Sequence, residues 1–374
     1  MPATLPAPDI PVILLYSLDP QWEPEERTGC RAEAAELVAA MAREGRQVRP
    51  VEVASLDPLR PLRGLDPSSC VIFNWCESLP GIPRSDALIA QALEEAGFTF
   101  TGSTAAVLAQ SWEKLQVKLL LDQEGIPTPR WMLCQRPGLA GWNRYPAIVK
   151  PCREHCSVGL DEESVALGPV QLRHQIARIL LQHRQPVLVE EFLDGREVHI
   201  TVWGDGRLEL LPAAEMDFSA FGRIQDRLCN FDSKYVPGSS HYEQITLRLP
   251  APLTAREQQQ LTAVCLATYR ALGCRDYARI DLRQAPDGTF LVLDVNPNAD
   301  LCRETSMAQS AELLGLSWGA MAVRLVDLAL QRHPAVRRRG PAPAARPPAA
   351  LGPPRPQPAS TALPTAARWA TAAG

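Results

Sequence analysis

The sequence has no unbroken apolar run long enough to span a bilayer. Its first residues, MPATLPAPDIPVILLYSLDP, lack basic side chains and hold only a short apolar stretch, so we expect a loop that enters a first strand and no signal peptide. An excess of positive charge is also absent: the net charge is −4, which gives no support to non-specific nucleic-acid binding. With 374 residues, 46% of them hydrophobic and 21% charged, the chain is typical of a soluble globular protein with two or three lobes.

Regularly spaced cysteines are missing as well. The ten cysteines are scattered, and without an export signal we expect reduced thiols in the cytoplasm. The densest group is Cys152, His155 and Cys156. A zinc site there would need two further ligands, and no second cluster follows at a suitable spacing, so we do not expect one.

Acidic residues are absent from the last 42 residues, 333–374, which contain ten prolines and six arginines. This composition cannot bury a core, and we expect a disordered tail. Because these six charges belong to a chain of net charge −4, residues 1–332 carry −10. The tail could contact an acidic partner, but a solvated extension is the better interpretation.

Strands and helices alternate in residues 1–110. Expected strands are 11–17, 47–54 and 69–75, and expected helices are 30–45 and 85–97. Ser85 is the expected N-cap of the second helix, and the two helices end at Gly45 and Gly97. The alternation favours a mainly parallel α/β lobe.

Residues 111–332 mix the two kinds of element in a different order. We expect helices from 111 to Gly125, at 170–183 and at 256–273, and strands at 145–152, 186–195, 196–206 and 207–215, with GDG as a hairpin turn. A less regular stretch, 217–250, interrupts them, and a second hairpin is expected at 277–296.

The stretch LVLDVNPNADL, residues 291–301, places an acid and an amide within an apolar strand. Side chains alternate along a strand, so Asp294 and Asn296 should share one face with Val292. A carboxylate in an apolar setting needs a partner. The residues alone allow two interpretations, a cation site or an Asx turn whose acid pairs with an arginine.

The preceding strand, YARIDLRQ, strengthens the cation interpretation. Alternation puts Arg279, Asp281 and Arg283 on one face, and the turn APDG lets the two strands pair. Two carboxylates, an amide oxygen and a guanidinium then converge. All-oxygen ligation suits Mg²⁺, so we expect a magnesium site at Asp281, Asp294 and Asn296. A structural Arg–Asp network is the alternative.

Two lysines are placed where phosphate groups could use them. Lys150 ends the apolar strand AIVK, and its charge must reach water or an anion; Lys114 lies in the helix SWEKLQVK. The loop after Lys150 contains Ser157 and Gly159, so its backbone N–H groups could close over phosphates. It lacks the GxxxxGK[ST] pattern of a Walker A loop.

Acids at strand ends could complete a nucleotide site. Glu190 and Glu191 end the strand VLVEE and Glu197 begins the next, which could serve the adenine edge and the ribose hydroxyls, although acids at strand ends are common. Lys234, in the irregular stretch, could reach an anion or remain on the surface.

Taken in order, the motifs YPAIVKPCREHCSVGL, VLVEEFLDGREVHI, SKY, GCRDYARIDL and LDVNPNADL resemble the ATP-grasp carboxylate–amine ligases, most closely the D-alanine–D-alanine ligase-like group. The resemblance covers about residues 10–330, and five separated motifs make it specific. It implies a fold: an α/β N-terminal (pre-ATP-grasp) lobe over 1–110, then a two-lobed α+β ATP-grasp domain over 111–332. The tail, 333–374, is not part of either.

The resemblance also implies a reaction. An ADP-forming, ATP- and Mg²⁺-dependent ligase (Mn²⁺ is possible) would join a small carboxylate to an amine, such as amino acids or peptides, through an acyl phosphate. Homodimers are common in the resembled group, so a homodimer is possible. The implied nucleotide contacts are Lys114, Lys150, Glu190, Glu191, Phe192, Leu193 and Glu197. The implied metal ligands are Asp281, Asp294 and Asn296, and the implied catalytic residues are Arg279, Lys234 and Ser157, the last in a loop that closes to exclude water.

This sequence departs from the group in the half that would select D-alanine. FNWCESLPG stands where HGxxGEDG is usual, and SLDPQWEPEER, with Glu23, Glu25 and Glu26, where GGxSxEHxVS is usual. HCSVG replaces GSSxG, and Asp294 replaces a glutamate. We therefore expect a different substrate pair. The alternatives are an authentic D-alanine–D-alanine ligase and a nucleotide-binding protein that has lost turnover.

Overall fold

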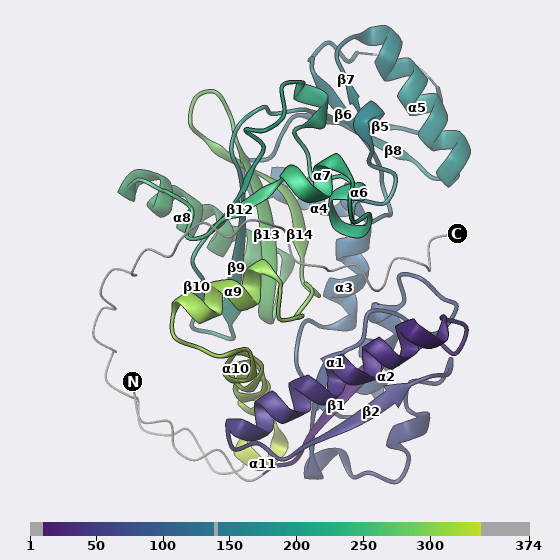
Figure 1. Cartoon of the computed structure of the whole chain (residues 1–374), viewed down its shortest axis with the longest axis vertical. Helices are drawn as coiled ribbons and strands as arrows, with labels where there is room; N and C mark the ends of the chain where they lie inside the picture. Colours follow the sequence, from purple (N-terminus) through teal and green to yellow (C-terminus); the bar gives the residue numbers. More distant parts are fainter. Residues whose placement is uncertain (1–9, 138–140, 338–374) are drawn as a thin grey trace.

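Three β-sheets with helices packed against them make up the described part of the chain, residues 10–137 and 141–337 of this computed structural model (Figure 1). The expected tail begins at residue 333. Its first residues form the short helix α11 (Pro334–Arg337), and the rest lies outside the described residues.

The N-terminal sheet is fully parallel, as the alternation of strands and helices predicted. Its strands are β1 (Val12–Ser17), β2 (Val48–Val53), β3 (Val71–Trp75) and β4 (Thr99–Phe100), in the order β2-β1-β3-β4. Helices α1 (Pro24–Arg43), α2 (Asp86–Glu95) and α3 (Ala105–Trp112) accompany it, with short 3₁₀ turns at Arg60–Leu62 and Pro67–Ser69. Ser85 stands at the N-cap of α2, but its hydroxyl donates to the Ile82 carbonyl instead of capping the helix.

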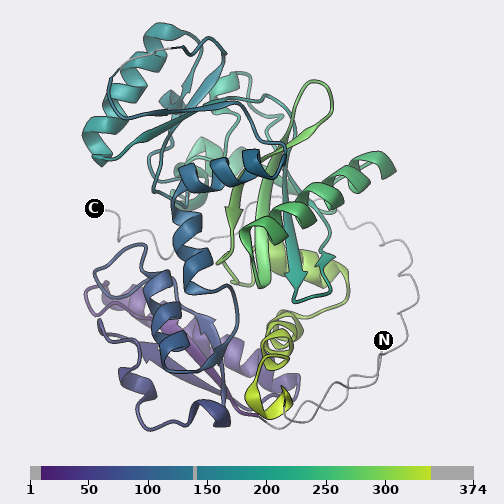
Figure 2. The same cartoon turned by 180° about the vertical axis from the view of Figure 1, so that it is seen from behind.

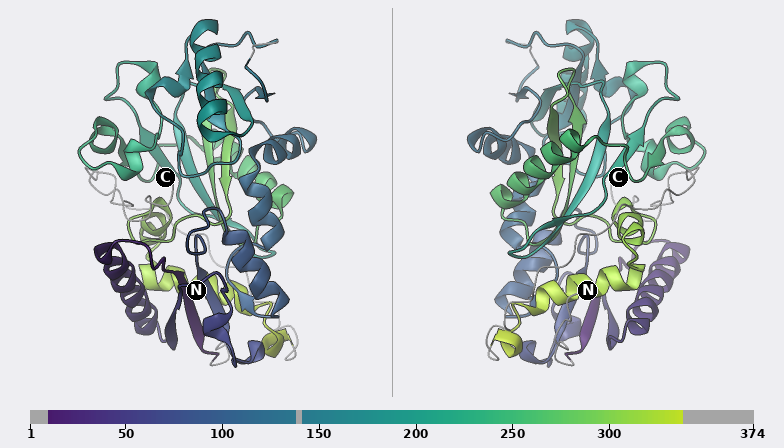
Figure 3. Two further views of the ribbon diagram at one scale, coloured as in Figure 1. Left: turned by 90° about the vertical axis from the view of Figure 1, so that its right-hand side faces the viewer. Right: turned by 90° about the vertical axis from the view of Figure 1, so that its left-hand side faces the viewer.

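A helix from the far end of the chain completes this lobe. Helix α10 (Trp318–Leu330) follows α9 (Ser306–Leu313) and lies against α1 (Figure 3). Side chains of β1, α1 and α10 share one core. The two helices approach so closely that a Cβ on Gly319 would lie 2.4 Å from the carbonyl oxygen of Ala40. The N-terminal lobe therefore contains residues from both ends of the described chain.

The middle of the chain forms a small antiparallel sheet. Its strands are β5 (Trp131–Cys134), β6 (Ala147–Pro151), β7 (Val165–Ala166) and β8 (Val187–Glu191), in the order β5-β8-β6-β7. Helix α5 (Pro169–His183) buries Leu172, Ile176 and Ile179 against it, and a 3₁₀ turn spans Glu162–Ser164. This sheet carries Lys150 on β6 and Glu190 on the neighbouring strand β8.

The largest sheet is antiparallel and holds the predicted second hairpin. Its strands are β9 (Glu197–Gly204), β10 (Glu209–Leu210), β11 (Ala214–Asp217), β12 (Thr246–Arg248), β13 (Asp276–Gln284) and β14 (Phe290–Asn296). Helices α4 (Lys114–Gln123) and α8 (Ala255–Leu272) bury apolar side chains on one face, which is seen from behind in Figure 2. The irregular stretch contains the 3₁₀ turn Ile224–Asp226 and the short helices α6 (Asp232–Tyr235) and α7 (Ser240–Gln244).

Three details differ from the sequence-based predictions. The helix expected from residue 111 is broken at Glu113, whose ψ of 84° ends α3 before α4 begins. The strand expected at 207–215 is two short strands, β10 and β11. A β-bulge in β14 places Val292 in the core with Val295, so the prediction that it shares a face with Asp294 is wrong.

No single helix among the described residues has the length and apolar character to cross a membrane. Helices α9 and α10 would qualify only as a pair, and they meet at a bend of 98°.

Candidate active site

A cleft of about 480 Å³ lies where the two antiparallel sheets and the N-terminal lobe meet. Its lining contains all thirteen side chains that the sequence analysis assigned to nucleotide contacts, metal ligation or catalysis: Lys114, Lys150, Ser157, Glu190, Glu191, Phe192, Leu193, Glu197, Lys234, Arg279, Asp281, Asp294 and Asn296. The structure thus brings the predicted residues together from eight separate segments. Their individual roles stay predictions.

The hairpin β13–β14 supplies the acidic end of the cleft. Asp281 and Asp294 are direct partners in the ladder, and Arg279 is the partner of Asn296. The Arg279 guanidinium donates to both carboxylate oxygens of Asp281 at 2.8 and 3.0 Å, and the Asn296 amide donates to the same carboxylate at 3.2 Å. Lys114, at the first turn of α4, donates to Asp294 at 3.1 Å.

Both carboxylates are ionised in this setting. Burial opposes the charge, but Lys114 and the neighbouring Lys150 and His155 together outweigh it and lower the pKa of Asp294 well below its usual range. Arg279 does the same, to a smaller extent, for the pKa of Asp281. Two ionised carboxylates and an amide oxygen on one sheet face are a donor set that fits Mg²⁺. Lys114 and Arg279 pair with these carboxylates in this structure.

A buried ion cluster lies at the end of the small sheet. Glu190 is fully buried, and its two oxygens pair with Lys118 and Lys150. Burial opposes ionisation of this carboxyl, yet the two lysines lower the pKa of Glu190 to about 2. Lys118 also donates to the Thr128 hydroxyl at 2.6 Å. Glu190 therefore fixes Lys150 at the wall of the cleft.

The strand end after Glu190 is already hydrogen-bonded through its backbone. The N–H groups of Glu191 and Phe192 donate to the carbonyls of Arg130 and Pro146, each at 2.9 Å, and the Leu193 carbonyl accepts from Arg283 at 2.6 Å. These groups were expected to contact adenine. That contact stays a prediction, and Phe192, Ile148 and Leu293 add apolar surface to the lining of the cleft.

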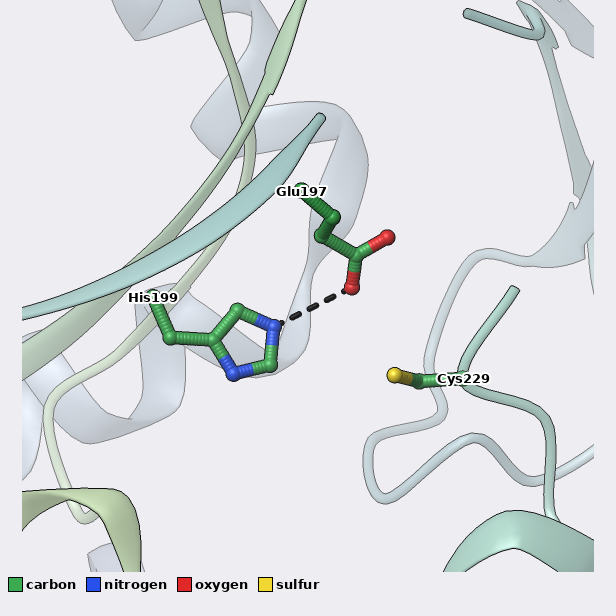
Figure 4. A group of neighbouring side chains, drawn as sticks. All are labelled: Glu197, His199 and Cys229. Carbon is green, nitrogen blue, oxygen red and sulfur yellow. Dashed lines mark hydrogen bonds and ion pairs between the residues drawn. The ribbon is translucent and has the colours of Figure 1, made fainter. Parts of the chain in front are cut away.

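Glu197 is held on two sides. Its Oε2 accepts from Arg283 at 2.8 Å, and its Oε1 lies 3.1 Å from Nε2 of His199 (Figure 4). Burial raises the pKa of this carboxyl, but Arg283 and His199 lower it to about 2. Cys229 faces the pair from the segment before α6, and burial and Glu197 raise the pKa of its thiol.

The loop after β6 bends over the cleft. Cys156 and Ser157 have positive φ values of 55° and 62°, and the Ser157 hydroxyl donates to the Cys229 carbonyl at 2.7 Å. His155 packs edge-on against Trp112, with ring centroids 4.3 Å apart, and bonds to the Ser111 carbonyl at 2.9 Å. Burial and Lys114 lower the pKa of His155 to about 4, so its ring is neutral at pH 7.

Residues 120–327 match the family described as D-ala D-ala ligase C-terminus. This match covers more than half of the chain. The chain belongs to the D-alanine–D-alanine ligase family.

Relatives are similar in sequence to this chain along most of its length. An uncharacterized protein, y4sG, of Sinorhizobium fredii is 30% identical over 325 residues, which cover 85% of this chain and 92% of that protein. The D-alanine–D-alanine ligase of Oleidesulfovibrio alaskensis is 29% identical over 313 residues, covering 83% and 94%.

Solved structures confirm the ATP-grasp fold that the motifs predicted. The chain is similar to the D-alanine–D-alanine ligase from Bacillus anthracis complexed with ATP, with a TM-score of 0.65, 18% identity and coverage of 88% of this chain and 99% of that one. It is also similar to the VanG D-Ala:D-Ser ligase from Enterococcus faecalis, with a TM-score of 0.64, 18% identity and coverage of 86% and 99%.

Sequence reasoning missed several residues of this ligase site. Lys118 had a signal, because it follows Lys114 by four residues and so lies one helical turn further along the same face. Arg283 was placed on the correct face, but its role as the partner of Glu197 was not predicted. His199 and Cys229 gave no signal: they come from a strand and an irregular segment that only the fold brings together. Glu23 and Glu26, candidates for the substrate side, instead form the capping box of α1.

Proposed function

We propose that the protein is an ATP- and Mg²⁺-dependent ligase that joins a small carboxylate to an amine, forms ADP and proceeds through an acyl phosphate. The observation that supports this most is the convergence of Asp281, Asp294 and Asn296 on one sheet face, with Lys114 and Arg279 beside them. We further propose that residues 1–110 form the N-terminal domain and 111–332 the ATP-grasp domain, with α10 packed back on the first.

The nucleotide would lie along the wall formed by β6, β8 and the hairpin. Lys114 and Lys150 reach this wall as cations, and Glu190 holds the second of them in place. Ile148, Phe192 and Leu293 give the base an apolar surface, and Glu197 would accept from ribose hydroxyls. A strand end with this mixture suits adenine, which needs apolar contact on its faces and a few polar groups at its edge.

The reacting groups would meet at the hairpin. Asp281, Asp294 and Asn296 would hold Mg²⁺, which supplies Lewis-acid neutralisation of phosphate charge when bound. The Arg279 fork, fixed by Asp281, is oriented to stabilise the carboxylate and the oxyanion of its later adduct. Lys234 lines the same cleft from α6 and would approach the transferred phosphate. The loop that carries Ser157 would exclude water, because an acyl phosphate hydrolyses readily.

The substrate pair is expected to differ from two molecules of D-alanine. Two of the segments that depart from the group's motifs line the cleft: FNWCESLPG contributes Glu77 and DVNPNADL contributes Asp300. With Glu304, which also lines the cleft, these acids would suit a charged amine. The named relatives at 29% identity favour a second candidate, an authentic D-alanine–D-alanine ligase. A substrate panel separates the two.

The test measures Mg²⁺-dependent release of ADP and phosphate with a panel of D- and L-amino acids and small peptides. One carboxylate–amine pair should stimulate release, and Asp294→Ala should reduce it by at least about 100-fold, since it removes charge from the reacting centre. Asp287→Ala is the matched control, because this acid lies at the exposed turn of the same hairpin. ATP binding without release by any pair would favour a protein that has lost turnover. A protein that binds no ATP would overturn the proposal.

A further inference from the structure

Three side chains of different ligand chemistry face one another inside the cleft. Glu197 and His199 point to the same side of β9 because they are two residues apart, and Cys229 approaches from the segment before α6 (Figure 4). The carboxylate oxygen, ring nitrogen and thiol sulfur all lie within 4.8 Å of one another. Within the described ranges, no other set of three such residues comes together in this way.

The donor set differs from that of the hairpin. One oxygen, one nitrogen and one sulfur suit Zn²⁺, whereas Mg²⁺ prefers oxygen alone. Zinc bonds of about 2.0–2.3 Å separate tetrahedral ligand atoms by about 3.5 Å, so the three residues need to close by only about 1 Å. A fourth ligand, water or an atom of a bound molecule, would come from the cleft, which all three side chains line.

The surrounding residues support such a site. Arg283 donates to the second oxygen of Glu197 at 2.8 Å, which leaves Oε1 directed at His199. Hydrogen-bonded carboxylates of this kind are usual around protein-bound metals, because the outer contact fixes the ligand's orientation. The carboxylate is ionised, so Nε2–H of His199 donates to it; on metal binding this proton moves to Nδ1 and the thiol proton passes to solvent.

We propose that Glu197, His199 and Cys229 bind one Zn²⁺, and that zinc and nucleotide exclude each other. The exclusion rests on the proposed function, since Glu197 is the residue expected to accept from the ribose. Zinc would tie Cys229 to β9 and, through the bond from Ser157 to the Cys229 carbonyl, hold the loop over the cleft. The protein would thereby be inhibited by zinc and activated by magnesium at two neighbouring sites, since Nε2 of His199 lies 4.0 Å from the carboxylate of Asp281.

Metal binding is tested first and without nucleotide. The full chain, stripped with a chelator, is titrated with Zn²⁺ by calorimetry and with Co²⁺ by absorption, where a thiolate ligand gives a charge-transfer band. We expect one equivalent and a thiolate band. Cys229→Ala should abolish the band, and both it and His199→Asn should weaken zinc binding by at least about tenfold. Cys274→Ala, which changes another half-buried cysteine outside the cleft, should change neither. Equal binding by the wild type and Cys229→Ala would overturn the site.

Exclusion is tested by titrating ATP in the presence of Mg²⁺, with and without one equivalent of Zn²⁺. Zinc should weaken ATP binding by the wild type and leave Cys229→Ala unaffected. Zinc that binds at Cys229 without changing the affinity for ATP would overturn the exclusion. If ATP does not bind even without zinc, the proposed function fails, while the one-equivalent titration and the thiolate band still establish the metal site.

Discussion

Asp281 and Asp294 are direct partners across the β13–β14 ladder, and the bulge that follows begins at the next pair, where Leu282 faces Val292. The bulge takes Leu293 out of the regular pairing. As a result both acids face the cleft, while Val292 and Val295 face the core beside α8. Bulges of this kind frequently adjust side-chain direction next to active sites.

The bidentate contact of Arg279 with Asp281 predicts that a lysine cannot replace this arginine. Arg279→Lys keeps the charge but loses the planar fork, so the group that faces the reacting carboxylate is no longer held in position. We expect ligand-stimulated ADP release to fall by about 100-fold. Arg256→Lys, on the exposed side of α8, should leave the rate unchanged. Equal rates for the two variants would contradict a role for the fork.

The cluster of Glu190 with Lys118 and Lys150 predicts a large effect on stability. Glu190→Gln leaves two lysines without their carboxylate in a buried setting, and removal of one partner from a buried ion pair costs about 3–5 kcal/mol. Urea unfolding without nucleotide measures this loss in the free energy of unfolding. Glu191→Gln is the control, because its pairing with Arg144 is at the surface and should change the free energy of unfolding by less than about 1 kcal/mol.

The same carboxyl predicts a pH dependence of stability. The pKa of Glu190 is about 2 in the folded protein, below the ordinary value of 4.5. The unfolded chain therefore takes up this proton first as the pH falls. The stabilisation should be complete above pH 4.5 and lost as the pH approaches 2. Because Glu197 titrates in the same window, the difference in unfolding free energy between wild type and Glu190→Gln is the quantity to follow. If this difference stays constant across this pH window, the cluster around Glu190 does not cause the pH dependence of the free energy of unfolding.

The sequence predicted elements whose pattern is local. Alternation placed Arg279 and Asp281 on one face, and the APDG turn fixed the pairing of the two strands, which the structure confirms. The sequence could not predict the bulge in β14, because the bulge depends on how β14 packs against α8. The break at Glu113 is similar: the sequence around it continues a helical pattern, and the turn between α3 and α4 follows from the contact of Lys114 N–H with the Cys152 carbonyl.

Contacts between distant segments could not be predicted from the sequence either, because they also depend on tertiary packing. Nothing near Cys229 marks it as a neighbour of Glu197 and His199, since only the path of residues 217–250 across the sheet brings them together. Helix α10 has an apolar face, but its place on α1 depends on small residues at Ala40 and Gly319 in both helices. Such pairings are properties of the assembled fold.

The hydrogen bond from Ser157 to the Cys229 carbonyl predicts a defect in coupling. It joins the loop after β6 to the segment before α6 at 2.7 Å. Ser157→Ala removes this link, so water should reach the activated carboxylate more often. We expect the ratio of phosphate released to amide formed to rise above one, with a smaller loss in total phosphate release. Cys156→Ala, one residue away and exposed, is the control. A ratio that stays at one would show that the link does not exclude water.

The contacts of Arg332 predict that the residues after α10 contribute to the stability of the rest of the chain. Its guanidinium donates to both oxygens of the buried Asp276 at 2.6 and 2.7 Å, to Asp205 at 2.7 Å and to the Phe100 carbonyl at 3.1 Å. These contacts join the residues after α10 to β13, to the turn after β9 and to β4. Arg332→Met leaves a buried carboxylate without its main partner and should lower the free energy of unfolding by about 3–5 kcal/mol.

Arg31→Gln is the matched control for this change, because its pair with Glu52 is exposed and should contribute less than about 1 kcal/mol. Urea unfolding followed by tryptophan fluorescence and by circular dichroism distinguishes two outcomes. Coincident loss of both signals at a lower urea concentration means that Arg332 stabilises the lobes as one unit. Two separated transitions would mean that the N-terminal lobe, with α10 packed on α1, unfolds independently of the large sheet. An unchanged midpoint would contradict a stabilising role for the Arg332 contacts.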